Sequence, residues 1–180
     1  MTIRGMAVCV LTLALAGAAG SIAHAQERQR ASPHETVTAE IDGATISITY
    51  GRPYMKGRQV AGGLIPYDKV WRTGADEATT LQTSRDLMFG PAHVSAGSVT
   101  LWTLASQTGP WKLILNKQTG QWGTAYDEKQ DLSRVDMRVE TLPAAVEQFT
   151  IAIEKNPAGK GGMLVMTWDT VKMTVPFSVM

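Results

Sequence analysis

The feature that most constrains the fold is an alternation of apolar and polar residues with a period of two. Near the C-terminus, Val171, Met173, Val175 and Phe177 are separated by Lys, Thr and Pro residues. Successive side chains of a β-strand point to opposite faces, so this pattern predicts a strand with one buried and one wet face. Helical periodicity is nearly absent from the chain, and we therefore expect an all-β fold.

The same alternation predicts further strands along the chain. Asp42-Gly43 separates two alternating runs and favours a tight hairpin, because both central residues of such a turn need positive φ. About eight or nine short strands predict an antiparallel two-sheet sandwich, jelly-roll-like, with a partly closed barrel as the alternative. The other expected strands lie within residues 79–83, 98–105, 111–116, 134–140, 148–154 and 163–168.

The N-terminus has the pattern of a signal peptide. Arg4 precedes an apolar run over residues 6–19, and Ala23-His24-Ala25 fits the small-x-small site that signal peptidase accepts. The run is shorter than the roughly 20 residues that cross a bilayer. We expect residues 1–25 to be cleaved, leaving residues 26–180 as one β-sandwich domain, periplasmic or secreted, with no transmembrane segment.

Composition excludes several classes of partner and chemistry. Seventeen Lys and Arg residues against 16 Asp and Glu residues give a formal charge of +1, which provides no global field for nucleic acid. The one cysteine, Cys9, lies inside the expected signal peptide, so disulfides, thiol nucleophiles and iron–sulfur ligation are not expected. The chain contains no nucleophile elbow, zinc-protease helix, phosphate loop or Rossmann fingerprint. We predict no cofactor and assign no catalytic residue.

Residues 51–78 interrupt the alternation and form the most informative stretch. A connection of this length in a compact domain is usually functional or disordered, and aromatic residues such as Tyr54, Tyr67 and Trp71 favour an ordered loop. Up to position 72 the segment is strongly basic, with Asp68 opposed by Arg52, Lys56, Arg58, Lys69 and Arg72. We therefore place the candidate site in this loop.

Several motifs in and beyond this loop resemble those of the exported bacterial domain-of-unknown-function 2911 family. They are Tyr50-Gly51-Arg52-Pro53, Lys56-Gly57-Arg58, Val70-Trp71-Arg72-Thr73-Gly74-Ala75-Asp76-Glu77 and Gln121-Trp122-Gly123. The family usually has Asn where this chain has Asp76. The resemblance implies a single β-rich, secreted or periplasmic domain and brings no established activity.

Two classes of function fit these residues. The first is a non-catalytic binding module of the cell envelope that holds an anionic or glycan ligand, or a partner protein, with the loop over residues 52–77. The alternative is a hydrolase or lyase of polysaccharide or peptidoglycan with Glu77 as acid/base. The candidate binding residues are Arg52, Lys56, Arg58, Trp71, Arg72, Asp76, Glu77 and Trp122.

The acidic residues of the motif lead to two further expectations. Asp76 and Glu77 are adjacent, so in an extended segment their side chains face opposite ways. We expect Arg52 or Arg72 to form an ion pair with one of these acids and tie the loop to the sandwich.

The histidines and Trp122 are less constrained by their sequence context. His34 and His93 are far apart in the mature chain; they could join Asp76 or Glu77 around a metal ion, but their spacing gives no ligand pair, so we predict no metal site. Trp122, which is flanked by Gly120 and Gly123, either stacks on a ligand or closes one end of the sandwich.

Overall fold

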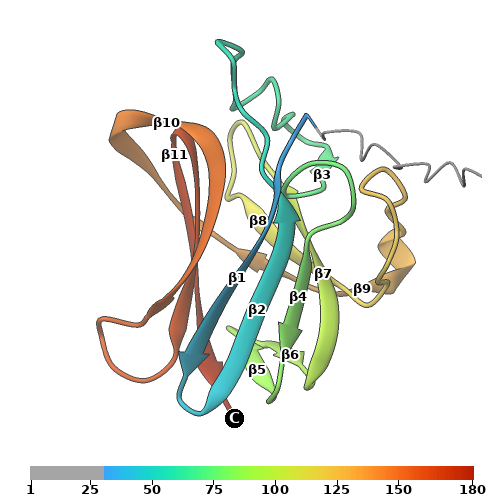
Figure 1. Cartoon of the computed structure of the whole chain (residues 1–180), viewed down its shortest axis with the longest axis vertical. Helices are drawn as coiled ribbons and strands as arrows, with labels where there is room; N and C mark the ends of the chain where they lie inside the picture. Colours follow the sequence, from blue (N-terminus) through green and yellow to red (C-terminus); the bar gives the residue numbers. More distant parts are fainter. Residues whose placement is uncertain (1–30) are drawn as a thin grey trace, which may run out of the picture.

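The computed structural model describes residues 31–180, so the expected signal peptide lies outside the described residues. Two antiparallel sheets pack against each other (Figure 1). The first has seven strands in the order β1-β2-β4-β7-β8-β9, with β3 paired to β7, and the second has four in the order β10-β11-β5-β6. The first sheet comprises β1 (His34–Ile41), β2 (Ala44–Gly51), β3 (Val70–Trp71), β4 (Thr80–Thr83), β7 (Gly97–Leu104), β8 (Lys112–Asn116) and β9 (Asp131–Asp136). The second comprises β5 (Leu87–Phe89), β6 (Ala92–Val94), β10 (Arg138–Lys155) and β11 (Gly162–Val179).

The predicted all-β sandwich is confirmed. Asp42 and Gly43 have φ values of 47° and 78° and join β1 to β2, as the hairpin signal required. Within the described residues the two sheets remain distinct, so the sandwich holds and the partly closed barrel does not. The described residues contain no helix that is long and apolar enough to span a membrane.

Two strand boundaries differ from the sequence-based expectation. The run over residues 134–140 is not one strand, because it breaks at the buried Met137, where the chain leaves the first sheet and enters the second. Val139, on the far side of this break, is exposed. The two runs near the C-terminus are joined into the single strand β11, which bends at Asp169, a residue with φ of 53°.

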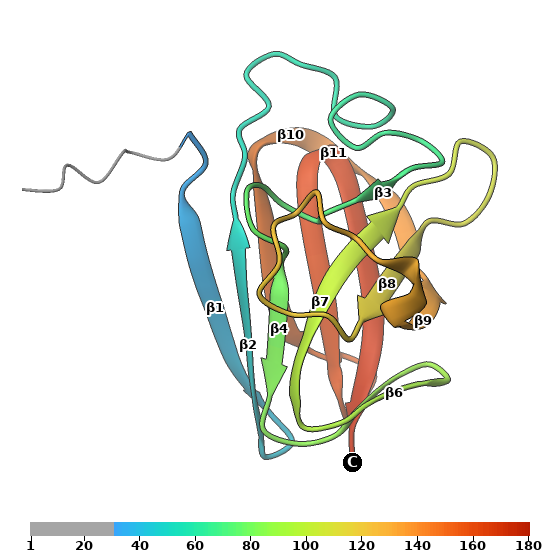
Figure 2. The ribbon, with the colours of Figure 1, turned by 90° about the vertical axis from the view of Figure 1, so that its right-hand side faces the viewer.

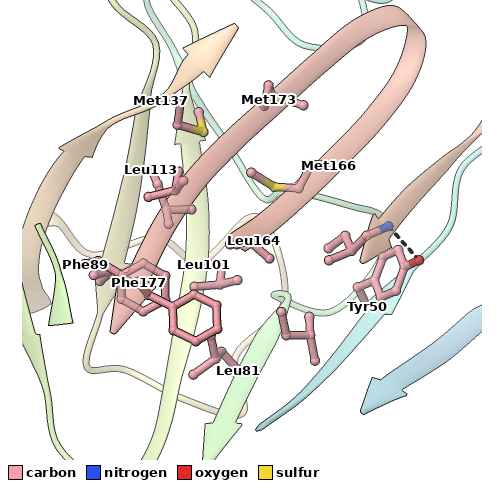
Figure 3. Close-up of a cluster of buried hydrophobic side chains, with 14 of the residues drawn as sticks. Tyr50, Leu81, Phe89, Leu101, Leu113, Met137, Leu164, Met166, Met173 and Phe177 are labelled. Atoms are coloured by element: carbon pink, nitrogen blue, oxygen red, sulfur yellow. Dashed lines mark hydrogen bonds between the residues drawn. The ribbon is translucent and has the colours of Figure 1, made fainter. Parts of the chain in front are cut away.

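The hydrophobic core fills the space between the sheets and draws on both of them (Figure 3). One part of the core is aromatic: Phe149 is fully buried and contacts the rings of Tyr50, Trp71 and Trp168. The buried Tyr50 hydroxyl accepts a 2.9 Å hydrogen bond from the backbone N–H of Ile151, which links β2 to β10. Burial is the main reason that the pKa of the Tyr50 phenol is raised.

This link between the sheets allows a first prediction. The change Tyr50→Phe keeps the ring and leaves the N–H of Ile151 without its acceptor, which costs about 1–3 kcal/mol of unfolding free energy. Urea denaturation followed by fluorescence measures the loss. The variant Tyr54→Phe, at a partly exposed position, is the control and should stay within about 0.5 kcal/mol of wild type. Equal stabilities for Tyr50→Phe and wild type would contradict the role of this hydrogen bond.

The long segment between β2 and β4 is ordered and runs over one end of the sandwich (Figures 1 and 2). Its first part adds to the outer edge of β10: Met55 N–H donates to the Glu147 carbonyl, and Phe149 N–H donates to the Pro53 carbonyl. Farther along, Val60 and Ile65 are fully buried. The edge strand β10 also contains Pro143 and two irregularities of pairing with β11 between residues 141 and 150.

Candidate functional site

A cleft of about 380 Å³ opens beside this segment. Trp71 and Trp168 line it from the core, where their rings stack at 5.8 Å with an interplanar angle of 19°. Tyr54 comes from the loop, and the charged side chains along the cleft are Lys56, Arg58, Arg72 and Asp76. Among the described residues, three cationic groups against one carboxylate give the lining a net positive charge, and the two indoles give it an apolar part.

Arg72 is the distinctive cation of the cleft. Its Nε is buried without a hydrogen-bond partner, and within residues 31–180 its guanidinium makes no ion pair. A buried donor left unpaired costs about 1–3 kcal/mol. The stem of the side chain is held from one side by Gly123, where an added Cβ would come within 2.2 Å of the Arg72 Cδ. The fold thus holds the Arg72 side chain at the cleft and gives its Nε–H no acceptor among the described residues.

The turn that follows Arg72 has a strained backbone and is held by hydrogen bonds and close packing. Thr73 has φ of 54°, which is unusual for a β-branched residue and has a cost of about 1–3 kcal/mol. Its buried hydroxyl shares a 2.9 Å hydrogen bond with that of Thr103, and the Thr79 hydroxyl donates to its carbonyl oxygen at 2.7 Å. The turn also passes close to β2, because an added Cβ at Gly51 would lie 2.3 Å from the Ala75 carbonyl oxygen. This packing gives the residues on either side of the turn defined positions.

Asp76 and Glu77 lie on the same side, together with His34, and the expectation that they face opposite ways is wrong. The reason is the backbone: Asp76 has φ of 63°, so the alternation of an extended strand does not apply at this position. His34 Nε2 is 2.8 Å from Glu77 Oε2, and one ligand atom from each of the three residues lies within 4.8 Å of the others. The position of His34 in the sequence does not indicate that it lies near Asp76 and Glu77. In the fold, the pairing of β1 with β2 brings it there.

The expected ion pair of Arg52 or Arg72 with these acids is also not found within residues 31–180. Arg52 instead pairs with Glu35 at 2.5 Å and donates to the Thr150 hydroxyl and the Phe149 carbonyl. It therefore ties the loop to β10 across the end of the sandwich. We expected an arginine to attach the loop to the sandwich, but we did not predict the residues that Arg52 contacts.

The remaining predicted residues divide between the cleft and its surroundings. Arg58 lines the cleft while donating to the carbonyl oxygens of Tyr54 and Met55, so its main contacts hold the loop. Lys56 is exposed, and its ammonium group makes no ion pair in the described part of the chain. Trp122 forms an isolated antiparallel β-bridge with Glu77 and is 51% exposed.

A second polar cluster lies outside this cleft. The Tyr126 hydroxyl donates to Asp131 at 2.7 Å, and Arg134 binds the same carboxylate. Burial, and next the hydrogen bond to Asp131, raise the pKa of Tyr126 to about 12. Tyr126 also packs on the buried Trp102. The mutual pairing of these groups marks a structural cluster.

Together, the sheets and the cleft define a two-layer β-sandwich protein with an open basic and aromatic cleft beside one long loop. The chain belongs to the DUF2911 family, described as proteins of unknown function, whose model matches residues 32–177. The resemblance expected from the sequence motifs is therefore confirmed. No curated protein and no solved structure matches the chain.

Proposed function

We propose that this protein is a non-catalytic binding domain of the cell envelope that takes a small anionic ligand into the cleft. The observation that carries the proposal is Arg72, which lines the cleft and whose buried Nε has no hydrogen-bond partner in the described residues. A carboxylate or phosphate supplies the acceptor that this donor lacks, and a planar guanidinium matches the geometry of both groups. Lys56 adds a second cation at the same cleft.

The aromatic lining supports a ligand that carries an apolar or ring-shaped part. Trp71 is 8% exposed and stacks on Trp168, so the two indoles are held in place before a ligand arrives. A pre-ordered apolar surface with a few placed polar groups is typical of small-molecule sites. An aromatic carboxylate or an acidic sugar fits this combination of charge and ring surface.

The hydrolase alternative gains no comparable support. Its acid/base candidate, Glu77, is not among the residues that line the cleft and instead contacts His34. The location in the cell envelope rests on the predicted signal peptide, and mass spectrometry of protein secreted by its host tests it. A mature chain that begins at Gln26 is the expected result.

Anion binding is tested with matched pairs of ligands. We expect benzoate and glucuronate, but not benzyl alcohol and glucose, to change the tryptophan fluorescence, because Trp71 and Trp168 line the cleft. The variant Arg72→Met should weaken anion binding about tenfold or more, as charge-assisted hydrogen bonds contribute about 1.5–3 kcal/mol. Its stability should equal or exceed that of wild type, since Met preserves the packed stem and removes the unpaired donor.

The control is Arg138→Met, which removes an exposed arginine that pairs with Glu140 away from the cleft. It should leave anion affinity unchanged. Equal binding of glucose and glucuronate, or wild-type affinity in Arg72→Met, would reject the anion site. A large loss of stability in Arg72→Met would show instead that Arg72 is a structural residue.

A further inference from the structure

We propose that His34, Asp76 and Glu77 form a binding site for a divalent transition-metal ion of the Zn²⁺ class at the rim of the cleft. The inference goes beyond anion binding and does not depend on it. It rests on three potential ligands that come from two distant segments of the chain, the start of β1 and the turn before β4.

The geometry is close to what a metal ion requires. Zinc binds imidazole nitrogen and carboxylate oxygen at about 2.0–2.2 Å, so two ligand atoms on one tetrahedral ion lie about 3.4 Å apart. In the structure, His34 Nε2 and Glu77 Oε2 are 2.8 Å apart, and the three ligand atoms lie within 4.8 Å of one another. Side-chain rotations that shift these atoms by about an ångström meet the metal geometry.

The charge of the cluster also favours a cation. Two carboxylates lie close together, and a cation between them would offset their mutual repulsion. The Asp76 carboxylate makes no hydrogen bond or ion pair with another residue in the described chain. A divalent ion would neutralise both acids at once. Because one ligand is an imidazole nitrogen, the site favours a transition metal over Ca²⁺ or Mg²⁺, which prefer ligand sets made of oxygen.

The backbone of each ligand is already fixed, so little ordering is needed on binding. His34 pairs with Gly51 in the β1–β2 ladder, and the adjacent Pro33 carbonyl accepts from Arg52 N–H at 2.7 Å. The Asp76 carbonyl accepts a hydrogen bond from Gly123 N–H at 2.9 Å, and Glu77 forms an isolated β-bridge with Trp122. Three ligands from the protein leave a coordination position for water or an exogenous group.

The position of Asp76 relates this site to the cleft. Asp76 belongs to the triad and also lines the cleft that contains Arg72. A divalent ion there neutralises the only carboxylate among the described residues of the lining. An anionic ligand in the cleft should then bind more tightly when the ion is present.

Isothermal titration of tag-free protein with ZnCl₂, in the absence of any organic anion, tests the site. We expect one ion per chain, and Co²⁺ should give a visible absorption spectrum on binding. The variants His34→Ala and Asp76→Asn should each lower the affinity at least tenfold. Asparagine suits the positive φ of residue 76, so the second variant changes charge while preserving the backbone. Mg²⁺ and Ca²⁺ should not compete at equal concentration.

The molecule contains a matched control. His93 Nε2 lies 2.8 Å from Asp86 Oδ2, the same separation as in the His34–Glu77 pair, but in the described residues no third ligand joins them. The variant His93→Ala should therefore keep full Zn²⁺ affinity. Arg72→Met should not lower the Zn²⁺ affinity, because it removes a positive charge from the cleft, and this separates failure of the metal site from failure of anion binding.

Three results would overturn the metal site. These are no stoichiometric binding by wild type, wild-type affinity in both His34→Ala and Asp76→Asn, or loss of binding in His93→Ala alone. Circular dichroism of each variant checks that it is folded. If His34→Ala does not fold, His34→Gln replaces it, because glutamine keeps the size and hydrogen-bonding capacity of the side chain without being a good zinc ligand.

Discussion

Replacing Phe149 with alanine is expected to lower the free energy of unfolding by about 3–5 kcal/mol. Phe149 is fully buried and makes ring contacts with Trp71 at 5.1 Å, Tyr50 at 5.7 Å and Trp168 at 5.8 Å. Removing it leaves a cavity among three large side chains whose backbones lie in the strands of both sheets, so the surroundings relax poorly. Urea denaturation at neutral pH measures the effect.

The control for this change is Trp122→Ala, which removes a larger aromatic side chain from a half-exposed position. Its unfolding free energy should stay within about 0.5 kcal/mol of wild type. Similar losses in the two variants would mean that the cluster around Phe149 is not the centre of the core. The cleft should also respond in Phe149→Ala, because Trp71 and Trp168 contact Phe149 and line the cleft.

The change Gly51→Ala should act on stability and binding together. The new Cβ would lie 2.3 Å from the Ala75 carbonyl oxygen, a backbone atom that cannot rotate away. We expect a loss of about 1–3 kcal/mol and a shift of the turn over residues 73–76. Because this turn places Arg72, Asp76 and Glu77, Zn²⁺ affinity and anion affinity should both fall.

Gly109→Ala is the matched control, since the nearest atom to its new Cβ is the Ser106 hydroxyl oxygen at 3.3 Å, on a side chain that can move. It should change stability by less than about 1 kcal/mol and leave both affinities intact. Wild-type metal affinity in a destabilised Gly51→Ala protein would show that the turn does not position the ligands.

The strands could be predicted from the sequence because burial of one face of a sheet makes apolar and polar residues alternate along each strand. This holds for β1, β2 and β11, whose apolar residues face the core as expected. The short strands β5 and β6 were not identified, because three residues are too few to show a period. The break at Met137 was missed because the alternation of apolar and polar residues in the sequence continues across it to Val139, while the backbone changes sheets and leaves Val139 exposed.

The sequence singled out the loop that lines the cleft, but not how its charged residues pair. The basic and aromatic loop does line a cleft, and Trp71 and Arg72 lie in it. The partners of each charge were not predictable, because they depend on distant segments: Glu35 for Arg52 and His34 for Glu77. One local signal for the triad was present in the sequence. Thr73-Gly74 followed by Asp76 is typical of a turn, and aspartate tolerates positive φ in turns, so Asp76 and Glu77 need not alternate as in a strand.

The attachment of the loop to β10 has a consequence for how the protein avoids self-association. A long edge strand is a template for pairing with another chain unless it is covered or interrupted. Residues 53–55 cover β10 beside Glu147 and Phe149, and Pro143, which lacks an N–H, lies nearby on the same strand. The segment that brings Tyr54 and Lys56 to the cleft therefore also covers the part of the β10 edge around Glu147 and Phe149. Evolution of a new ligand preference in this loop is constrained by the need to keep that part of the edge covered.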